Sequence, residues 1–243
     1  MKFLSAIGFL TIIPIPSRAV SNEGGQVLYF PLAGFVIGCL LYGLDQLLSL
    51  APYPEVRVVG DVLFLAVISG ALHLDGLADT ADGVFSHRPR EQILQIMKDS
   101  RIGVMGVLTL LFCILLKLAG VAGVIHSESL IWLILAPALG RTAQVMGLVF
   151  VNHVPSERTL AEQFYQRGRY SLLAFCPLPF AVIFYVDWIL AIASLILFIF
   201  LLVSLLLFFK NKIGGITGDT LGAATEIMET AFLLIGGMGA SIF

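Results

Sequence analysis

Long apolar runs with almost no charge constrain this chain more than any other feature of its sequence. The run from Trp188 to Phe209 contains no charged residue. It is long enough to cross a bilayer, since a membrane-spanning helix needs about 20 mostly apolar residues. Of the 243 residues, 12% are charged and 58% are hydrophobic, which leaves too little polar surface for a soluble globule. The composition therefore excludes most soluble folds and intrinsic disorder.

We predict an all-α, polytopic transmembrane helical bundle of about seven spans, formed by a single integral-membrane domain over residues 1–243. The expected spans are Tyr29–Leu50, Val58–Leu74, Gly103–Val124, Leu130–Val151, Ser171–Val186, Trp188–Phe209 and a last segment that reaches Phe243. The apolar run Phe3–Ile13 is too short to span and is expected to be an interfacial or re-entrant helix. No Pro or Gly pair follows the second span before Pro89, so its helix is expected to continue into the polar segment behind it.

The positive charges indicate how these spans are oriented. If the loop from Asp75 to Arg101 is cytoplasmic, Arg57 is the only lysine or arginine in the loops on the opposite side. This asymmetry is the positive-inside bias of membrane proteins. The net charge of −2 argues against a nucleic-acid partner, which would require a basic field.

An acidic stripe follows the second span directly. Asp75, Asp79 and Asp82 are spaced by four and three residues, so a helix places them on one face. Three carboxylates on one face repel each other unless a cation lies between them. Oxygen ligands without His or Cys suit Mg²⁺, with Mn²⁺ as the alternative. The sequence therefore predicts a divalent metal site, although a solvated helix face would show the same spacing.

A second acidic group opens the last helical segment. Asp219 and Glu226 are seven residues apart, and Gly214, Gly218 and Gly222 recur every fourth residue beside them. Such a glycine stripe permits very close contact between helices. The expected topology puts this turn on the same side of the membrane as the first acids, so that the two groups could complete one metal site. The alternative is a packing motif with incidental acids.

Basic and hydrogen-bonding residues are placed to meet an anion. Arg101 follows Asp99 at the mouth of the third span, and Arg141 lies in the middle of the fourth. A charged residue at that depth faces a polar cavity or an acidic partner, which here means phosphate or an ion pair with Asp45 or Asp61. With His73, these groups suit phosphoryl transfer, in which metal ions and arginines neutralise and orient the phosphates.

Five segments of the chain resemble motifs of the cobalamin synthase family, also called adenosylcobinamide-GDP ribazoletransferases. They are Ile13–Pro16, which contains two prolines, Tyr29–Gly34, Gly70–Gly83, Ile96–Gly103 and Gly214–Ala223. The resemblance covers most of the chain. It implies a multi-pass protein of the bacterial or archaeal cell (inner) membrane whose active site faces the cytoplasm.

The resemblance also implies an activity. Members join adenosylcobinamide-GDP to α-ribazole, or to its 5′-phosphate, with Mg²⁺, and release GMP. By this resemblance, the expected metal ligands are Asp75, Asp79, Asp82 and Asp219. The expected catalytic residues are Asp82, Asp99 and Arg101. The expected further contacts to substrate are His73, Arg141, Thr217 and Glu226. A homo-oligomer or a complex with other enzymes of cobalamin synthesis is left open.

Three other functions compete with this interpretation. One is a structural membrane scaffold, which would explain the glycine stripe but not the aspartates. The string Asp79–Gly83 is also similar to the opening of the aspartate motif of CDP-alcohol phosphotransferases, which would make a phospholipid. That likeness ends at Ser86-His87, and Ala223 stands where those enzymes have a final aspartate, the expected base. A transporter is the third alternative, but it would place its acids at mid-bilayer rather than at one edge.

Overall fold

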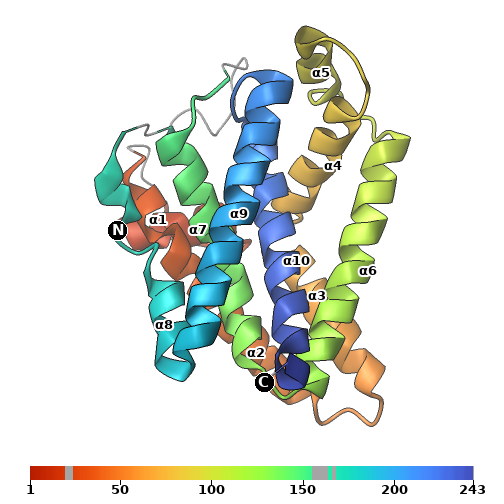
Figure 1. Ribbon diagram of the computed structural model, residues 1–243, viewed down its shortest axis with the longest axis vertical. Helices are drawn as coiled ribbons and strands as arrows, with labels where there is room; N and C mark the ends of the chain where they lie inside the picture. The colour runs from red at the N-terminus through yellow and green to blue at the C-terminus, as the bar shows by residue number, and fades with distance from the viewer. Residues whose placement is uncertain (20–23, 155–163, 166–167, 243) are drawn as a thin grey trace.

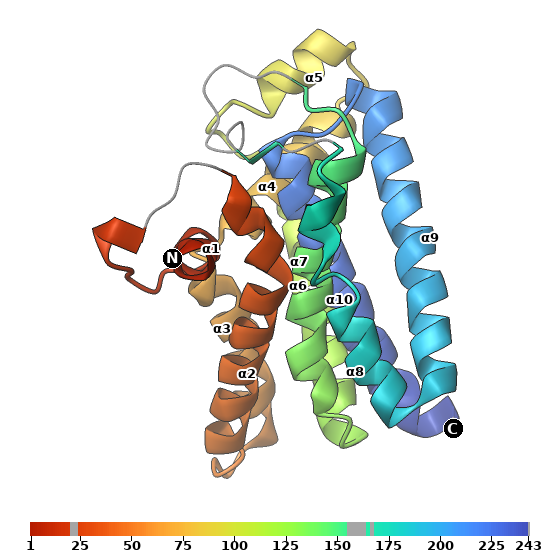
Figure 2. The ribbon, with the colours of Figure 1, turned by 90° about the vertical axis from the view of Figure 1, so that its left-hand side faces the viewer.

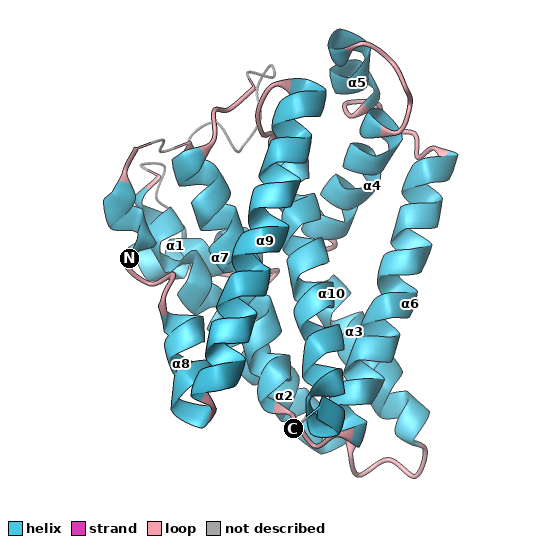
Figure 3. Cartoon of the chain, viewed as in Figure 1, coloured by secondary structure: helices cyan, strands magenta, loops and turns pink. Residues whose placement is uncertain are grey.

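The computed structural model describes residues 1–19, 24–154, 164–165 and 168–242, and in that part the chain is helical, without a strand beyond one isolated bridge between His153 and Ile216. The α-helices are α1 (Lys2–Leu10), α2 (Phe30–Leu48), α3 (Pro54–Ile68), α4 (Leu72–Val84), α5 (Arg90–Ile96), α6 (Val104–His126), α7 (Ile131–Phe150), α8 (Leu178–Val186), α9 (Trp188–Ile213) and α10 (Gly218–Ile242). Figure 3 shows the resulting bundle of helices joined by short loops. The all-α prediction is confirmed.

In the part of the chain that the structure describes, five helices are long and apolar enough to cross a membrane. They are α2 with the short turn before it (Gly25–Leu48), α6, α7, α9 and the residues Gly218–Met238 of α10. A sixth span results if α3 and α4 count together. The expected count of seven is not confirmed, because the apolar helix over Tyr170–Val186 is shorter than a full span. Helix α1 has nine residues, too few to cross, as expected of the N-terminal run.

The second expected span is bent rather than continuous. Helices α3 and α4 meet at an angle of 84°, so the prediction of one uninterrupted helix is wrong. Gly70 and Ala71 both have a φ of 59° at the break, a left-handed conformation that ends a right-handed helix. Because of this bend, the acidic helix α4 does not continue along the axis of α3.

The loops gather at two ends of the bundle (Figure 1). Helix α5, the start of α6 and the ends of α7 and α9 lie at the top of the view, and the links α2–α3, α6–α7 and α8–α9 lie at the bottom. The segments expected on one side of the membrane thus share one end of the bundle. Arg158 and Arg167, which belong to the same predicted loop, lie outside the described residues.

Helix α7 is the centre of the bundle and α9 lies at its edge (Figures 1 and 2). Within their apolar windows, 83% of α7 is buried but only 22% of α9. Gly34 and Gly38 of α2 lie directly on the backbone of α7, where a Cβ atom would meet Pro137 and Ile134 within 2.6 Å. The small-residue pair therefore provides the close helix contact that its spacing predicts.

Four charged side chains form a buried ion cluster (Lys117, Arg141, Glu226 and Glu229) where α6, α7 and α10 meet. The Nζ atom of Lys117 lies 2.6 Å from a carboxylate oxygen of Glu226 and 2.6 Å from one of Glu229. Arg141 donates to the other oxygen of Glu229. No side chain of the cluster is more than 5% exposed. Charges this deep are costly unless paired, and here two cations meet two carboxylates.

Helices α4 and α10 cross in backbone contact. A Cβ atom on Gly76 would lie 2.8 Å from the carbonyl oxygen of Asp219, and one on Gly222 would lie 3.3 Å from the Cα atom of His73. The glycines leave no side chain between the two helices, so the backbones approach directly. The crossing brings the beginning of α10 to the beginning of α4.

Gly76→Ala is expected to weaken the fold, because the new methyl group meets backbone atoms that cannot move aside. We expect a loss of about 1–3 kcal/mol, the usual cost of overpacking. The measurement is the thermal unfolding midpoint of the purified protein in detergent. Gly43→Ala is the matched control, since nothing lies within 4 Å of its Cβ position. Equal midpoints for the two variants would contradict the close crossing.

Lys117→Met is expected to cost about 3–5 kcal/mol, because it leaves Glu226 buried without its cation. Adding Glu226→Gln should recover part of the loss, so the two changes are not additive. Unfolding of the single and double variants in detergent tests this coupling. Arg101→Met serves as control: that side chain is 88% exposed, and the midpoint should not move. Additive losses at Lys117 and Glu226 would rule out the ion cluster.

Candidate functional site

A polar cavity of about 230 Å³ lies between α4 and the segment that joins α5 to α6. Asp75 and Asp79 line it from α4, and Lys98, Asp99 and Ser100 line it from the joining segment. The structure thus brings two of the expected metal ligands to the Lys98–Arg101 motif. This cavity lies at the end of the bundle where α5 and the start of α6 are found (Figure 1).

Asp219 approaches these acids from α10. Its backbone lies against Gly76, one residue after Asp75. The negative charges of Asp75, Asp219 and Asp82 all act on Asp79, in that order of strength, and that of Asp75 acts on Asp219. The acids that are distant in sequence therefore converge in space. Asp219 also lies in the first turn of α10, where the helix dipole favours a carboxylate or a bound phosphate.

Asp82 has a different environment from the other acids. Its two carboxylate oxygens accept hydrogen bonds from the backbone N–H groups of Gly103 and Gly106, each at 2.7 Å. A Cβ atom on either glycine would collide with this carboxylate. Asp82 therefore caps the start of α6 and does not line the cavity. The sequence prediction treated it as equivalent to Asp79, because spacing alone does not show which neighbouring helix each side chain faces.

Asp99, which lines the cavity, forms an ion pair with Arg101, which does not. The guanidinium of Arg101 lies 2.6 Å from Asp99 Oδ2, and the backbone N–H of Arg101 donates to Asp99 Oδ1 at 3.1 Å. These hydrogen bonds lower the pKa of the Asp99 carboxyl to about 2. Asp99 is thus a permanent anion at neutral pH, and Arg101, which is 88% exposed, keeps most of its donors available to a ligand.

Thr217 begins α10 as its N-cap. Its hydroxyl accepts from the backbone N–H of Thr220 at 3.2 Å, and the Thr220 hydroxyl accepts from the N–H of Thr217 at 2.8 Å. This reciprocal pair is the capping-box arrangement. Thr217 also donates its hydroxyl hydrogen bond to Asp219. Thr217 therefore fixes the position of the Asp219 side chain.

Three of the expected substrate contacts lie in the interior instead of the cavity. Arg141 pairs with Glu229 and Glu226 pairs with Lys117 in the buried ion cluster. The predicted ion pair of Arg141 with Asp45 or Asp61 is wrong, since Arg141 pairs with Glu229 and Asp45 pairs with Arg57. His73 is 2% exposed, and its Nδ1 atom lies 3.4 Å from the amide nitrogen of Gln144.

Sequence reasoning missed Lys117 and underrated Glu229. The signal was present, because a lysine in the middle of the apolar run Gly103–Val124 must find a partner. Lys98 was also passed over, although it stands next to Asp99. In the structure it lines the cavity opposite Asp75 and Asp79 of α4.

The carboxylates at the cavity suit a hard cation such as Mg²⁺ only if a substrate phosphate supplies further oxygen ligands. Carboxylate oxygens are of the type that Mg²⁺ prefers. Among the described residues, however, no group of three or more His, Cys, Asp or Glu stands close enough to hold a metal by itself. Mg²⁺ commonly takes one or two carboxylates and completes its shell with water and substrate phosphate. The two carboxylates that line the cavity from α4, Asp75 and Asp79, therefore fit Mg²⁺ that arrives with a phosphate group.

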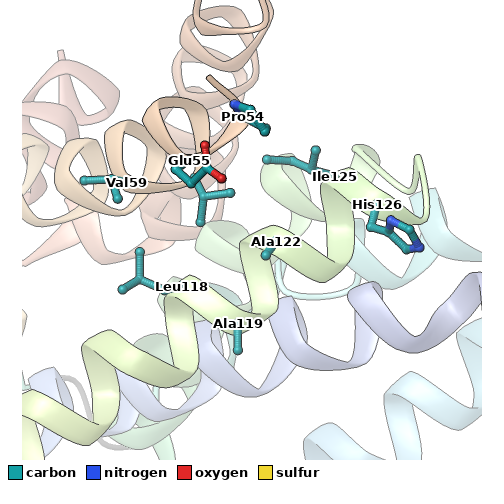
Figure 4. A pocket seen from close by; sticks show the side chains of 9 residues that line it. Pro54, Glu55, Val59, Leu118, Ala119, Ala122, Ile125 and His126 are labelled. Carbon is teal, nitrogen blue, oxygen red and sulfur yellow. The ribbon is translucent and has the colours of Figure 1, made fainter. Parts of the chain in front are cut away.

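A larger cavity, of about 660 Å³, lies between α3 and α6 near the opposite end of the bundle (Figure 4). Apart from Glu55 and His126, its walls are apolar side chains such as Val59 and Leu118. It holds none of the acids described above. Size therefore does not identify the site in this molecule, and the convergence of charged groups does.

Comparison with known proteins gives one family. The family model described as cobalamin-5-phosphate synthase matches residues 2–237. The chain is 34% identical over 241 residues to the adenosylcobinamide-GDP ribazoletransferase of Brevibacillus brevis, covering 96% of both chains. It is 37% identical over 242 residues to that of Pseudomonas syringae pv. syringae, covering 96% of this chain and 98% of the relative.

No solved structure matches the chain. The relatives are nevertheless matched over nearly their whole length, and the family model spans the cavity, the α4–α10 crossing and the buried ion cluster alike. The chain therefore belongs to the cobalamin-5-phosphate synthase family.

Proposed function

We propose that the chain transfers the adenosylcobinamide-phosphate group from adenosylcobinamide-GDP to α-ribazole, or to its 5′-phosphate, with release of GMP. The observation that carries the proposal is the convergence of Asp75 and Asp79 with Lys98 and Asp99 around one polar cavity. The charge of Asp219 also acts on Asp79, and its backbone lies against Gly76. The names of the relatives supply the substrates.

In the proposed reaction, the ribazole hydroxyl attacks the phosphorus that carries the cobinamide. A new phosphate ester bond forms, the bond to the GMP phosphate breaks, and the hydroxyl proton is lost. Mg²⁺, when bound, neutralises the diphosphate and favours departure of GMP. Asp75, Asp79 and Asp219 would hold this cation. Lys98, in the other wall of the cavity, and Arg101, paired with Asp99 of that wall, would attract the phosphate oxygens.

Asp82 takes a positioning role in this scheme. Because both of its oxygens bind the start of α6, it fixes the joining segment, and with it Asp99 and Arg101, against α4. We therefore assign the metal to the other three acids. Asp99 acts as a positioning residue as well, since its ion pair orients the guanidinium of Arg101.

The structure does not favour a phospholipid synthase. The position that would carry the final aspartate of those enzymes is Ala223, which is 1% exposed. Ala223 lines an apolar cavity on the other side of α4. A base at this place would be separated from the acids by the helix itself.

The proposed location is the inner membrane, with the α5 end of the bundle in the cytoplasm. This end carries Arg88, Arg90, Lys98, Arg101, Lys210 and Lys212. The opposite end carries Arg57, which is paired with Asp45. A bacterial membrane protein with this distribution of positive charge has its basic end inside.

The decisive test is GMP release by the purified protein in detergent, given adenosylcobinamide-GDP and α-ribazole. We expect release with Mg²⁺ and none with EDTA. Asp79→Asn and Asp219→Asn should each lower turnover by at least about 100-fold, the scale for removing a metal ligand or its support. Asp187→Asn is the matched control: Asp187 caps α9 by accepting from Ile189 and Leu190, and asparagine caps equally well.

Asp82→Asn separates the two roles considered for that residue. If Asp82 caps α6, its variant should lose about 1 kcal/mol of stability, since it weakens a charged cap, and should keep its affinity for Mg²⁺. Unfolding in detergent and the Mg²⁺ dependence of turnover measure these two effects separately. An unchanged stability with a large rise in the Mg²⁺ requirement would make Asp82 a ligand after all.

A further inference from the structure

A third cavity, of about 530 Å³, lies between α6 and α9, with α4 and α10 forming its floor. In Figure 1, α6 and α9 stand on either side of α10. Its walls are almost entirely apolar, with Phe112, Leu205 and Ile227 contributed by three of these helices. The proposed reaction makes no use of this cavity.

The cavity faces the hydrocarbon of the bilayer. Its walls include α6, α9 and α10, which are three of the five candidate spans. Helix α9 stands apart from the bundle at this point, since it packs chiefly on α8 and contacts α10 sparsely. Phe112 is 60% exposed on the rim. Empty apolar space forfeits dispersion contacts, and in a bilayer the available filler is an acyl chain.

Positive charge lies at one end of the same cavity. The Nζ atom of Lys212 is 5.9 Å from the centre of the Phe208 ring, and Phe208 lines the cavity. The guanidinium carbon of Arg90 lies 2.8 Å from the Cβ position of Gly214, where α9 ends. Among the described residues, neither cation forms an ion pair with a carboxylate.

This combination selects one kind of occupant. The basic end of the cavity coincides with the end of the spans, which is the level of the lipid headgroups, and the apolar part extends from there toward the bilayer centre. We propose that the cavity is a binding site for an anionic phospholipid, with one acyl chain between α6 and α9 and its phosphate between Lys212 and Arg90.

The test is native mass spectrometry of the full chain in detergent, with phosphatidylglycerol or phosphatidylcholine added. The wild-type protein should bind phosphatidylglycerol the more tightly. Lys212→Gln should weaken its binding about five-fold, which corresponds to the attraction of one basic residue to an anionic surface. Arg18→Gln, which removes an exposed cation outside the cavity, is the control and should bind like the wild type.

A second variant fills the cavity itself. Ala231 lines it from α10, so Ala231→Phe should displace the acyl chain and reduce binding of both lipids. Ile196→Phe is the control for an added ring, since Ile196 of α9 is 64% exposed and lies outside the cavity. Equal binding of the two lipids with no effect of Lys212→Gln would overturn the site. So would undiminished lipid binding by Ala231→Phe. Both readouts are independent of GMP release, so failure of the proposed reaction would not affect them.

Discussion

The close crossing of α4 and α10 is the contact on which the candidate site depends. Asp75 and Asp79 lie on one helix and Asp219 begins the other, and like charges oppose this approach. Gly76 removes the side chain that would keep the two backbones apart. Burial of the rest of α10, which is two-thirds buried over its apolar window, compensates for the repulsion. A bound cation would turn that repulsion into attraction.

The buried ion cluster fixes the position of α10 along its own axis. Glu226 and Glu229 both lie on α10, whereas their partners Lys117 and Arg141 come from α6 and α7. Apolar side chains tolerate a small sliding of one helix past another, but these ion pairs do not. A shift of α10 would leave charges unpaired in a medium of low dielectric constant, at a cost of several kcal/mol. Asp219, two turns earlier on the same helix, is thereby held in register with α4.

The sequence predicted the helical class, most of the spans and the convergence of the two acidic groups, because these follow from hydropathy and charge along the chain. It did not predict the break before α4, since Ala71 adopts a left-handed conformation that alanine seldom takes. Nor could it distinguish Asp82 from Asp79. Both lie on one face of a helix, and only the placement of α6 decides that Asp82 meets two amide groups while Asp79 lines the cavity.

Helix α4 separates two environments, and this arrangement gives a physical reason for a charged substrate to be handled at a membrane. On one side, Asp75 and Asp79 face the polar cavity; on the other, Leu77 and Ala81 face apolar walls within the spans. A short helix in water would present such acids on a mobile element, because isolated helices of this length are marginally stable. Packed on α10 and α6, α4 holds its acids rigidly at the edge of the bundle. The bilayer thus supports the scaffold, while the phosphates need to reach only the end that faces water.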